Sequence, residues 1–120
     1  MLRLDRRFDN RIPFETYLNT YVLDRPQRAV TVDISETGLL LHTLPRDPLL
    51  QGTPIGLELK LPGVRDVIWA AGEACRDVYD DYFHGTGVRF TAMARTHARL
   101  INEYCFKLRR RRLYGVSLLA

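Results

Sequence analysis

The chain has 120 residues and a mass of 13.9 kDa, which leaves room for one compact domain. Its hydrophobic fraction of 46% and charged fraction of 27% are typical of a globular protein and argue against a disordered or fibrous chain. No apolar run is long enough to span a membrane, and residues 1–7 are too charged for a signal peptide, so we expect a cytoplasmic protein. The net charge of +4 comes mainly from arginine, because Lys60 and Lys107 are the only lysines among 18 basic residues.

Short segments of alternating hydrophobicity follow one another from residue 12 to residue 90. Apolar and polar side chains alternate from Ile12 to Val22, which is typical of a half-buried strand. Turn-forming residues such as Pro26 and Gly38 separate the segments that follow. In all, the pattern predicts six strands, over residues 12–22, 30–35, 39–43, 55–61, 67–76 and 83–90. Because short turns join them, we expect an antiparallel β-barrel rather than a parallel sheet.

The last third of the chain changes to a helical pattern, from residue 94 to about residue 112. Apolar side chains recur on one face of this helix, at Leu100, Ile101, Tyr104, Cys105 and Leu108. Four arginines at 109–112 suit the negative end of the helix dipole. We therefore divide the chain into an Arg-rich arm over residues 1–12, a barrel with its C-terminal helix over residues 13–112, and a tail over residues 113–120.

Residue patterns that carry enzyme chemistry are absent from the sequence. There is no phosphate-binding P-loop, no dinucleotide-binding glycine motif, and no zinc-protease or serine-hydrolase signature. His42, His84 and His97 are not spaced as metal ligands. Cys75 and Cys105 lie 30 residues apart in the sequence and are interpreted as two small buried hydrophobic residues. We therefore expect no enzyme activity, no metal and no other cofactor.

The arm carries a cluster of arginines. Arg7 and Arg11 form an RxxxR pattern, and Arg6 adds to its charge. Arginine presents a planar fork of donors that matches a phosphate group or the O6 and N7 atoms of guanine. Because so polar a segment buries too little apolar surface to order itself, we expect the arm to be flexible until an anionic ligand binds. The alternative interpretation is that the cluster is only a solvated run of charge.

A DxSxxG pattern closes the second predicted strand, with Asp33, Ser35 and Gly38 as its fixed residues. Strand alternation places Asp33 and Ser35 on one face, away from Val32 and Ile34. The Asp33 carboxylate can accept hydrogen bonds from N1–H and N2–H of guanine, and Gly38 allows the backbone to approach a ligand closely. The same residues can also form a local hydrogen-bonded turn, and the two interpretations are compatible.

With both motifs in this order and at this spacing, the sequence resembles the PilZ domain family, the bacterial receptors of cyclic di-GMP. Residues 85–90 also resemble the family's final GxGVxF strand, so that the resemblance covers nearly the whole chain. It implies a six-stranded antiparallel barrel with a C-terminal helix. The ligand residues that it implies are Arg7, Arg11, Asp33, Ser35 and Gly38, with Arg6 assisting. For the residue that stacks on a guanine in many members, Arg76 is our candidate and Trp69 the alternative.

The favoured hypothesis is a second-messenger receptor that binds cyclic di-GMP and relays binding to a protein partner by a conformational change. The sequence does not identify that partner. A PilZ-type adaptor that acts by protein contact alone, without the nucleotide, is the alternative. The arginine run at 109–112 suggests nucleic acid, but no aromatic residues are interleaved with it, so nucleic-acid binding is not expected.

Overall fold

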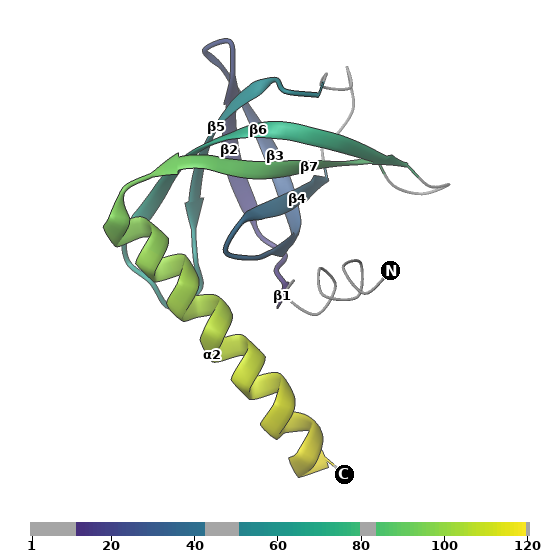
Figure 1. The fold of residues 1–120 in the computed structure, drawn as a ribbon, viewed down its shortest axis with the longest axis vertical. Coiled ribbons are helices and arrows are strands. Elements are labelled where there is room, and N and C mark those ends of the chain that lie inside the picture. Colours follow the sequence, from purple (N-terminus) through teal and green to yellow (C-terminus); the bar gives the residue numbers. More distant parts are fainter. Residues whose placement is uncertain (1–11, 43–50, 80–83, 120) are drawn as a thin grey trace.

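The computed structural model describes residues 12–42, 51–79 and 84–119 (Figure 1). Within these ranges, seven strands precede one helix, namely β1 (Ile12–Pro13), β2 (Tyr17–Val22), β3 (Arg25–Ile34), β4 (Gly38–His42), β5 (Pro54–Lys60), β6 (Val67–Tyr79), β7 (His84–Met93) and α2 (Arg95–Leu119). All pairings are antiparallel, in the order β1-β3-β2-β5-β6-β7-β4. Pairing of β3 with β4 closes six strands into a barrel. The predicted barrel with a C-terminal helix is therefore confirmed.

The first predicted strand is split, because the chain leaves the regular ladder between β1 and β2. There the Thr31 hydroxyl donates to the Phe14 carbonyl oxygen (2.5 Å) and accepts a hydrogen bond from the Thr16 amide (3.0 Å). Thr31 is fully buried at 0% exposure, so its hydroxyl needs partners inside the protein. The side chain of one β3 residue thus holds the segment that connects the two strands.

The hairpin between β2 and β3 turns earlier than we predicted. Leu23 and Asp24 have positive φ angles of 53° and 63°, as the two central residues of a type I′ turn do. Pro26, which we placed in the turn, instead lies in β3 opposite Tyr21. As a result β3 begins at Arg25 rather than near residue 30.

A bulge in β3 changes which of its residues face the core. Alternation predicted Val30, Val32 and Ile34 on one face, but Thr31 and Ile34 are both 0% exposed, whereas Val30 and Val32 are half-buried. The pairing of β3 with β4 shifts register between Thr31 and Asp33, which adds one residue to β3. Of the three residues that we predicted on one face, only Ile34 is fully buried in the core.

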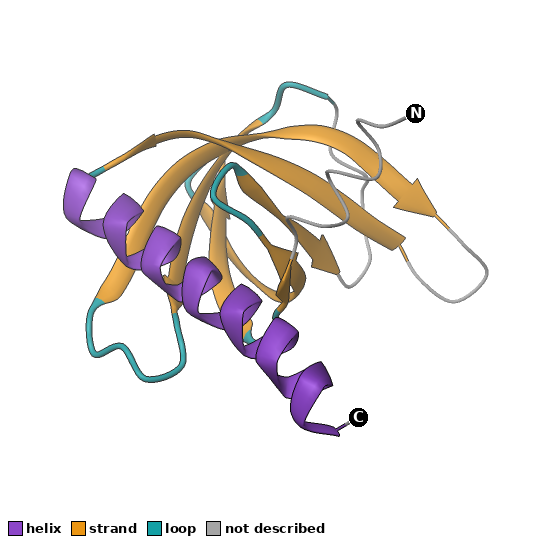
Figure 2. Ribbon diagram, turned by 60° about the horizontal axis from the view of Figure 1, so that its bottom comes forward, coloured by secondary structure: helices purple, strands orange, loops and turns teal. Residues whose placement is uncertain are grey.

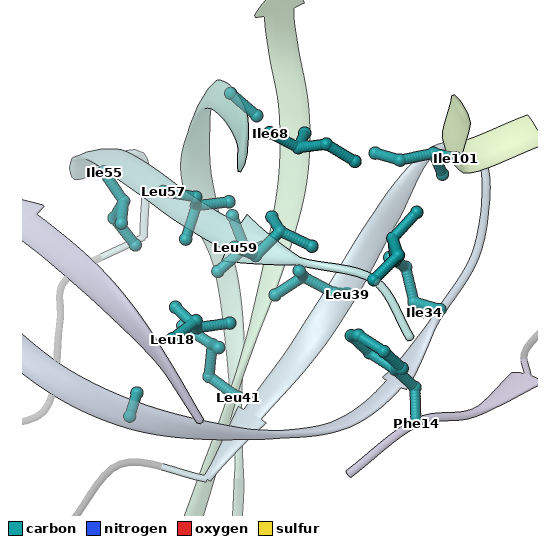
Figure 3. Packing of buried hydrophobic residues seen from close by; sticks show 14 of the residues in the cluster. Phe14, Leu18, Ile34, Leu39, Leu41, Ile55, Leu57, Leu59, Ile68 and Ile101 are labelled. Carbon is teal, nitrogen blue, oxygen red and sulfur yellow. The ribbon is translucent and has the colours of Figure 1, made fainter. Parts of the chain in front are cut away.

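The barrel interior is filled by aliphatic side chains from every long strand (Figure 3). Helix α2 contributes Ile101 and Cys105 to this core, where they are 1% and 0% exposed. The helix packs against one end of the barrel and extends beyond it (Figures 1 and 2). It continues to Leu119, past residue 112 where we expected it to end.

Candidate functional site

The turn between β3 and β4 carries the DxSxxG residues. Its ends are joined by the Ser35 amide, which donates to the Gly38 carbonyl oxygen (2.8 Å). The Ser35 hydroxyl accepts a hydrogen bond from the Thr37 amide (3.2 Å). Ser35 is 5% exposed, because it follows the end of β3 at Ile34 and its hydroxyl forms hydrogen bonds within the turn. It therefore does not share one strand face with Asp33, which is half-buried. The local serine turn is therefore present in this structure.

Gly38 begins β4 where this strand passes very close to β7. A Cβ atom at position 38 would lie 2.1 Å from the Val88 carbonyl oxygen, so no side chain fits there. On the other side of β7, a Cβ atom at Gly72 would lie 2.7 Å from the Arg89 carbonyl oxygen. Strand β7 thus runs between two glycines, and Gly38 has a packing role that does not depend on any ligand.

The first described residues lie against the motif strand. Strand β1 pairs with β3 so that Ile12 is opposite Ile34 and Pro13 is opposite Asp33. The Phe14 amide continues this contact by donating to the Val32 carbonyl oxygen (2.9 Å). The arm arginines, namely Arg6, Arg7 and Arg11, lie outside the described residues. The register nevertheless brings the chain that follows them into the barrel beside Asp33.

The barrel register aligns Asp33 with the candidate residue on β6. Asp33 is opposite Leu40, Leu40 is opposite Gly87, and Gly87 is opposite Arg76. These four residues form one row across β3, β4, β7 and β6. Because neighbouring strands are about 4.8 Å apart, the backbones of Asp33 and Arg76 are separated by about 14 Å along this row. The side chain of Arg76 is outside the described part of the structure.

Helix α2 reaches the motif turn through one ion pair. The two terminal nitrogens of Arg109 donate to the two carboxylate oxygens of Glu36, each at 2.6 Å. These hydrogen bonds lower the pKa of Glu36. Glu36 directly follows Ser35, so the pair joins the C-terminal helix to the middle of the motif. Sequence reasoning missed this contact, although Arg109 stands one helical turn after Cys105, on the side of α2 that packs against the barrel.

The chain also matches a known family. The family model described as PilZ domain matches residues 5–107. This chain belongs to the PilZ domain family. The resemblance inferred from the two motifs is therefore confirmed at the level of the family.

Solved structures share the fold of this PilZ domain at low sequence identity. The inhibitor of motility MotI/DgrA from Bacillus subtilis has a TM-score of 0.71 and 18% identity, over 87% of this chain and 49% of that one. The PilZ domain of YcgR from Escherichia coli, solved with c-di-GMP, has a TM-score of 0.65 and 19% identity, over 89% of this chain and 94% of that one. The chain thus spans about half the length of MotI/DgrA. No curated protein sequence matches it.

In this PilZ domain Trp69 lies in a cluster separate from the motif turn. It is 51% exposed and its ring stacks on that of Tyr21, with 6.3 Å between ring centroids. The Tyr21 hydroxyl donates to Glu58 (2.8 Å), which is opposite Trp69 in the sheet. The Trp69 amide donates to Nδ1 of His97 in α2 (3.1 Å). These contacts place Trp69 on the outer face of β6 with Tyr21 and Glu58, and do not bring it to Asp33 or Gly38.

Neither cysteine takes part in a disulfide bond. Cys105 is fully buried, as predicted, and burial raises its pKa to about 11. Cys75 is half-buried. Within residues 12–42, 51–79 and 84–119, no group of three potential ligands gathers as a metal site. The single helix of that part is not apolar enough to cross a membrane.

Proposed function

We propose that this PilZ domain is a receptor for cyclic di-GMP. The proposal is supported by similar structures that were solved with c-di-GMP, namely those of YcgR from Escherichia coli and PlzA from Borreliella burgdorferi. The observation that carries it is the pairing of β1 with β3. Because Pro13 is opposite Asp33, the chain that directly follows the arm lies beside the acidic end of the motif strand, although the two segments are distant in sequence.

The arginines supply the donors in this proposal. Arg7 and Arg11, with Arg6 assisting, donate to the phosphates or to O6 and N7 of a guanine, because their planar forks match both groups. Their charges offset the two negative charges of the ligand, and the new hydrogen bonds offset the entropy lost when the arm orders. Arg76, which lies in the same row as Asp33, contacts the second guanine.

The motif turn supplies the acceptors and the shape of the site. Asp33 accepts from N1–H and N2–H of one guanine. Ser35 and Gly38 contribute the backbone of a compact turn that the ligand approaches closely, with the Ser35 hydroxyl fixed by the Thr37 amide. The ordered arm then presents a new surface to a protein partner. No chemical step is involved, so cyclic di-GMP is released unchanged.

Titration calorimetry with cyclic di-GMP tests this proposal. We expect saturable binding to the wild-type chain, and Arg7→Ala, Arg11→Ala and Asp33→Ala should each weaken it by roughly 1.5–3 kcal/mol, which is the scale of a lost charged hydrogen bond. Arg28→Ala is the matched control, since Arg28 lies over the Tyr17 ring in the part of β3 far from the motif. A folded chain that gives no binding heat would support the adaptor alternative and refute the receptor.

Prolonged incubation provides a second readout of the same proposal. Chromatography should recover the nucleotide intact. Linear pGpG or GMP among the products would contradict a receptor without catalysis.

A further inference from the structure

The arginine run at 109–112, within α2, includes side chains in two different environments. Arg109 is half-buried and points to the barrel, where it forms a two-pronged ion pair with Glu36. Arg110 is exposed and lies over the Phe106 ring, 5.7 Å from its centroid. Arg111 is also exposed. Arg109 therefore has a specific partner in the motif turn, and the side chains of Arg110 and Arg111 are exposed.

The Glu36–Arg109 pair differs from an ordinary surface ion pair. The side chains of Arg109 and Glu36 are only 26% and 35% exposed, and both bonds are 2.6 Å long. Two parallel charge-assisted bonds fix the orientation of both groups as well as their distance. Because Glu36 stands between Ser35 and Thr37, fixing its side chain restrains the centre of the turn.

A second contact joins α2 to the base of the arm. Tyr104 packs edge-on against Phe14, with 5.6 Å between ring centroids. Phe14 directly follows β1, which is the strand that leads from the arm into the barrel. Five residues further along the same helix, Arg109 holds Glu36. Helix α2 therefore contacts both parts of the candidate site, the base of the arm and the motif turn.

We propose that Arg109 is a positioning residue of the nucleotide site, which holds the Ser35–Gly38 turn in its binding shape through Glu36 and so couples ligand binding to the docking of α2. This inference rests on the proposed function. The coupling is reciprocal, because a contact that favours binding must itself be favoured when the ligand is bound. Cyclic di-GMP should therefore tighten the attachment of α2 to the barrel. The change at the site then reaches the part of the helix that extends beyond the barrel, where a partner can contact it.

A double-mutant cycle on the full chain tests the inference. Arg109→Ala and Glu36→Ala should each weaken cyclic di-GMP binding about threefold to tenfold, which is the scale of a partly buried ion pair. The double variant should bind no more weakly than either single variant, because both remove the same interaction. Arg109→Lys, which keeps the charge but not the two-pronged geometry, should lie between Arg109→Ala and wild type. Arg111→Ala removes the same charge from the same helix and should bind as wild type does.

Hydrogen exchange supplies the readout that a purely structural role would not change. Amides of residues 101–109 should gain protection on ligand binding in the wild type and in Arg111→Ala, and not in Arg109→Ala. Circular dichroism establishes that each variant is folded before titration. If wild type binds and Arg109→Ala binds equally well, the inference is wrong and the proposed function stands. If wild type itself does not bind, the proposed function fails and the inference fails with it.

Discussion

Replacing Gly38 by alanine tests how the barrel closes between β4 and β7. The added methyl group would lie 2.1 Å from the Val88 carbonyl oxygen, where ordinary contact begins at 3.4 Å. The obstructing atom belongs to the backbone of a paired strand, so only a movement of β4 away from β7 can relieve the clash. Overpacking usually destabilises a protein by about 1–3 kcal/mol. Because this clash involves the backbone, we expect a loss near the upper end, about 3 kcal/mol.

Urea unfolding without ligand, followed by the fluorescence of the single tryptophan, measures this loss. Gly72→Ala should be destabilising too, since its methyl group would meet the Arg89 carbonyl oxygen at 2.7 Å. Gly56→Ala is the control, because the nearest atom, Cβ of Tyr21, would be 3.4 Å away. We expect Gly56→Ala to be the most stable of the three variants, Gly72→Ala to be less stable, and Gly38→Ala to be the least stable. If Gly38→Ala were as stable as Gly56→Ala, the close approach would be refuted and only a role in ligand binding would remain for Gly38.

Two further predictions concern ionisable groups. The hydrogen bonds from Arg109 lower the pKa of Glu36, so the pair stabilises the fold fully above the ordinary carboxyl pKa of 4.5, and this stabilisation is lost as the pH falls through the lower pKa of the folded state. The free energy of unfolding of wild type should therefore exceed that of Glu36→Gln by less in acid than at neutral pH, and a difference that is independent of pH would contradict this. Burial disfavours the Cys105 thiolate, so at about pH 8 a thiol reagent should modify Cys75 in the native chain and Cys105 only after unfolding. Equal rates of modification of the two cysteines in the native chain would show that Cys105 is accessible.

The barrel and the helix were predictable because each follows from a local repeat in the sequence. Alternation identified β5, where Ile55, Leu57 and Leu59 all face the core. The helical repeat identified Ile101 and Cys105 as buried residues of α2. Such patterns need no knowledge of distant partners, since the chain itself repeats with the period of the element.

The details of the candidate site could not be predicted in the same way. The bulge at Val32 depends on how β3 pairs with β4, and no local pattern announces it. The pair of Glu36 with Arg109 joins residues 73 positions apart, and either residue alone resembles an ordinary surface charge. The close contact of Gly38 with Val88 and the contribution of α2 became visible only in three dimensions.

Comparing two cyclic dinucleotides of equal charge tests the central claim most directly. Cyclic di-AMP carries the same two phosphates as cyclic di-GMP but lacks the N1–H and N2–H groups from which Asp33 is proposed to accept hydrogen bonds. In titrations of the wild-type chain at the same salt concentration, we predict that cyclic di-GMP binds more tightly by about 1–3 kcal/mol, the scale of one correctly read base edge. Equal affinities would contradict guanine recognition and leave only the attraction of a basic chain for an anion.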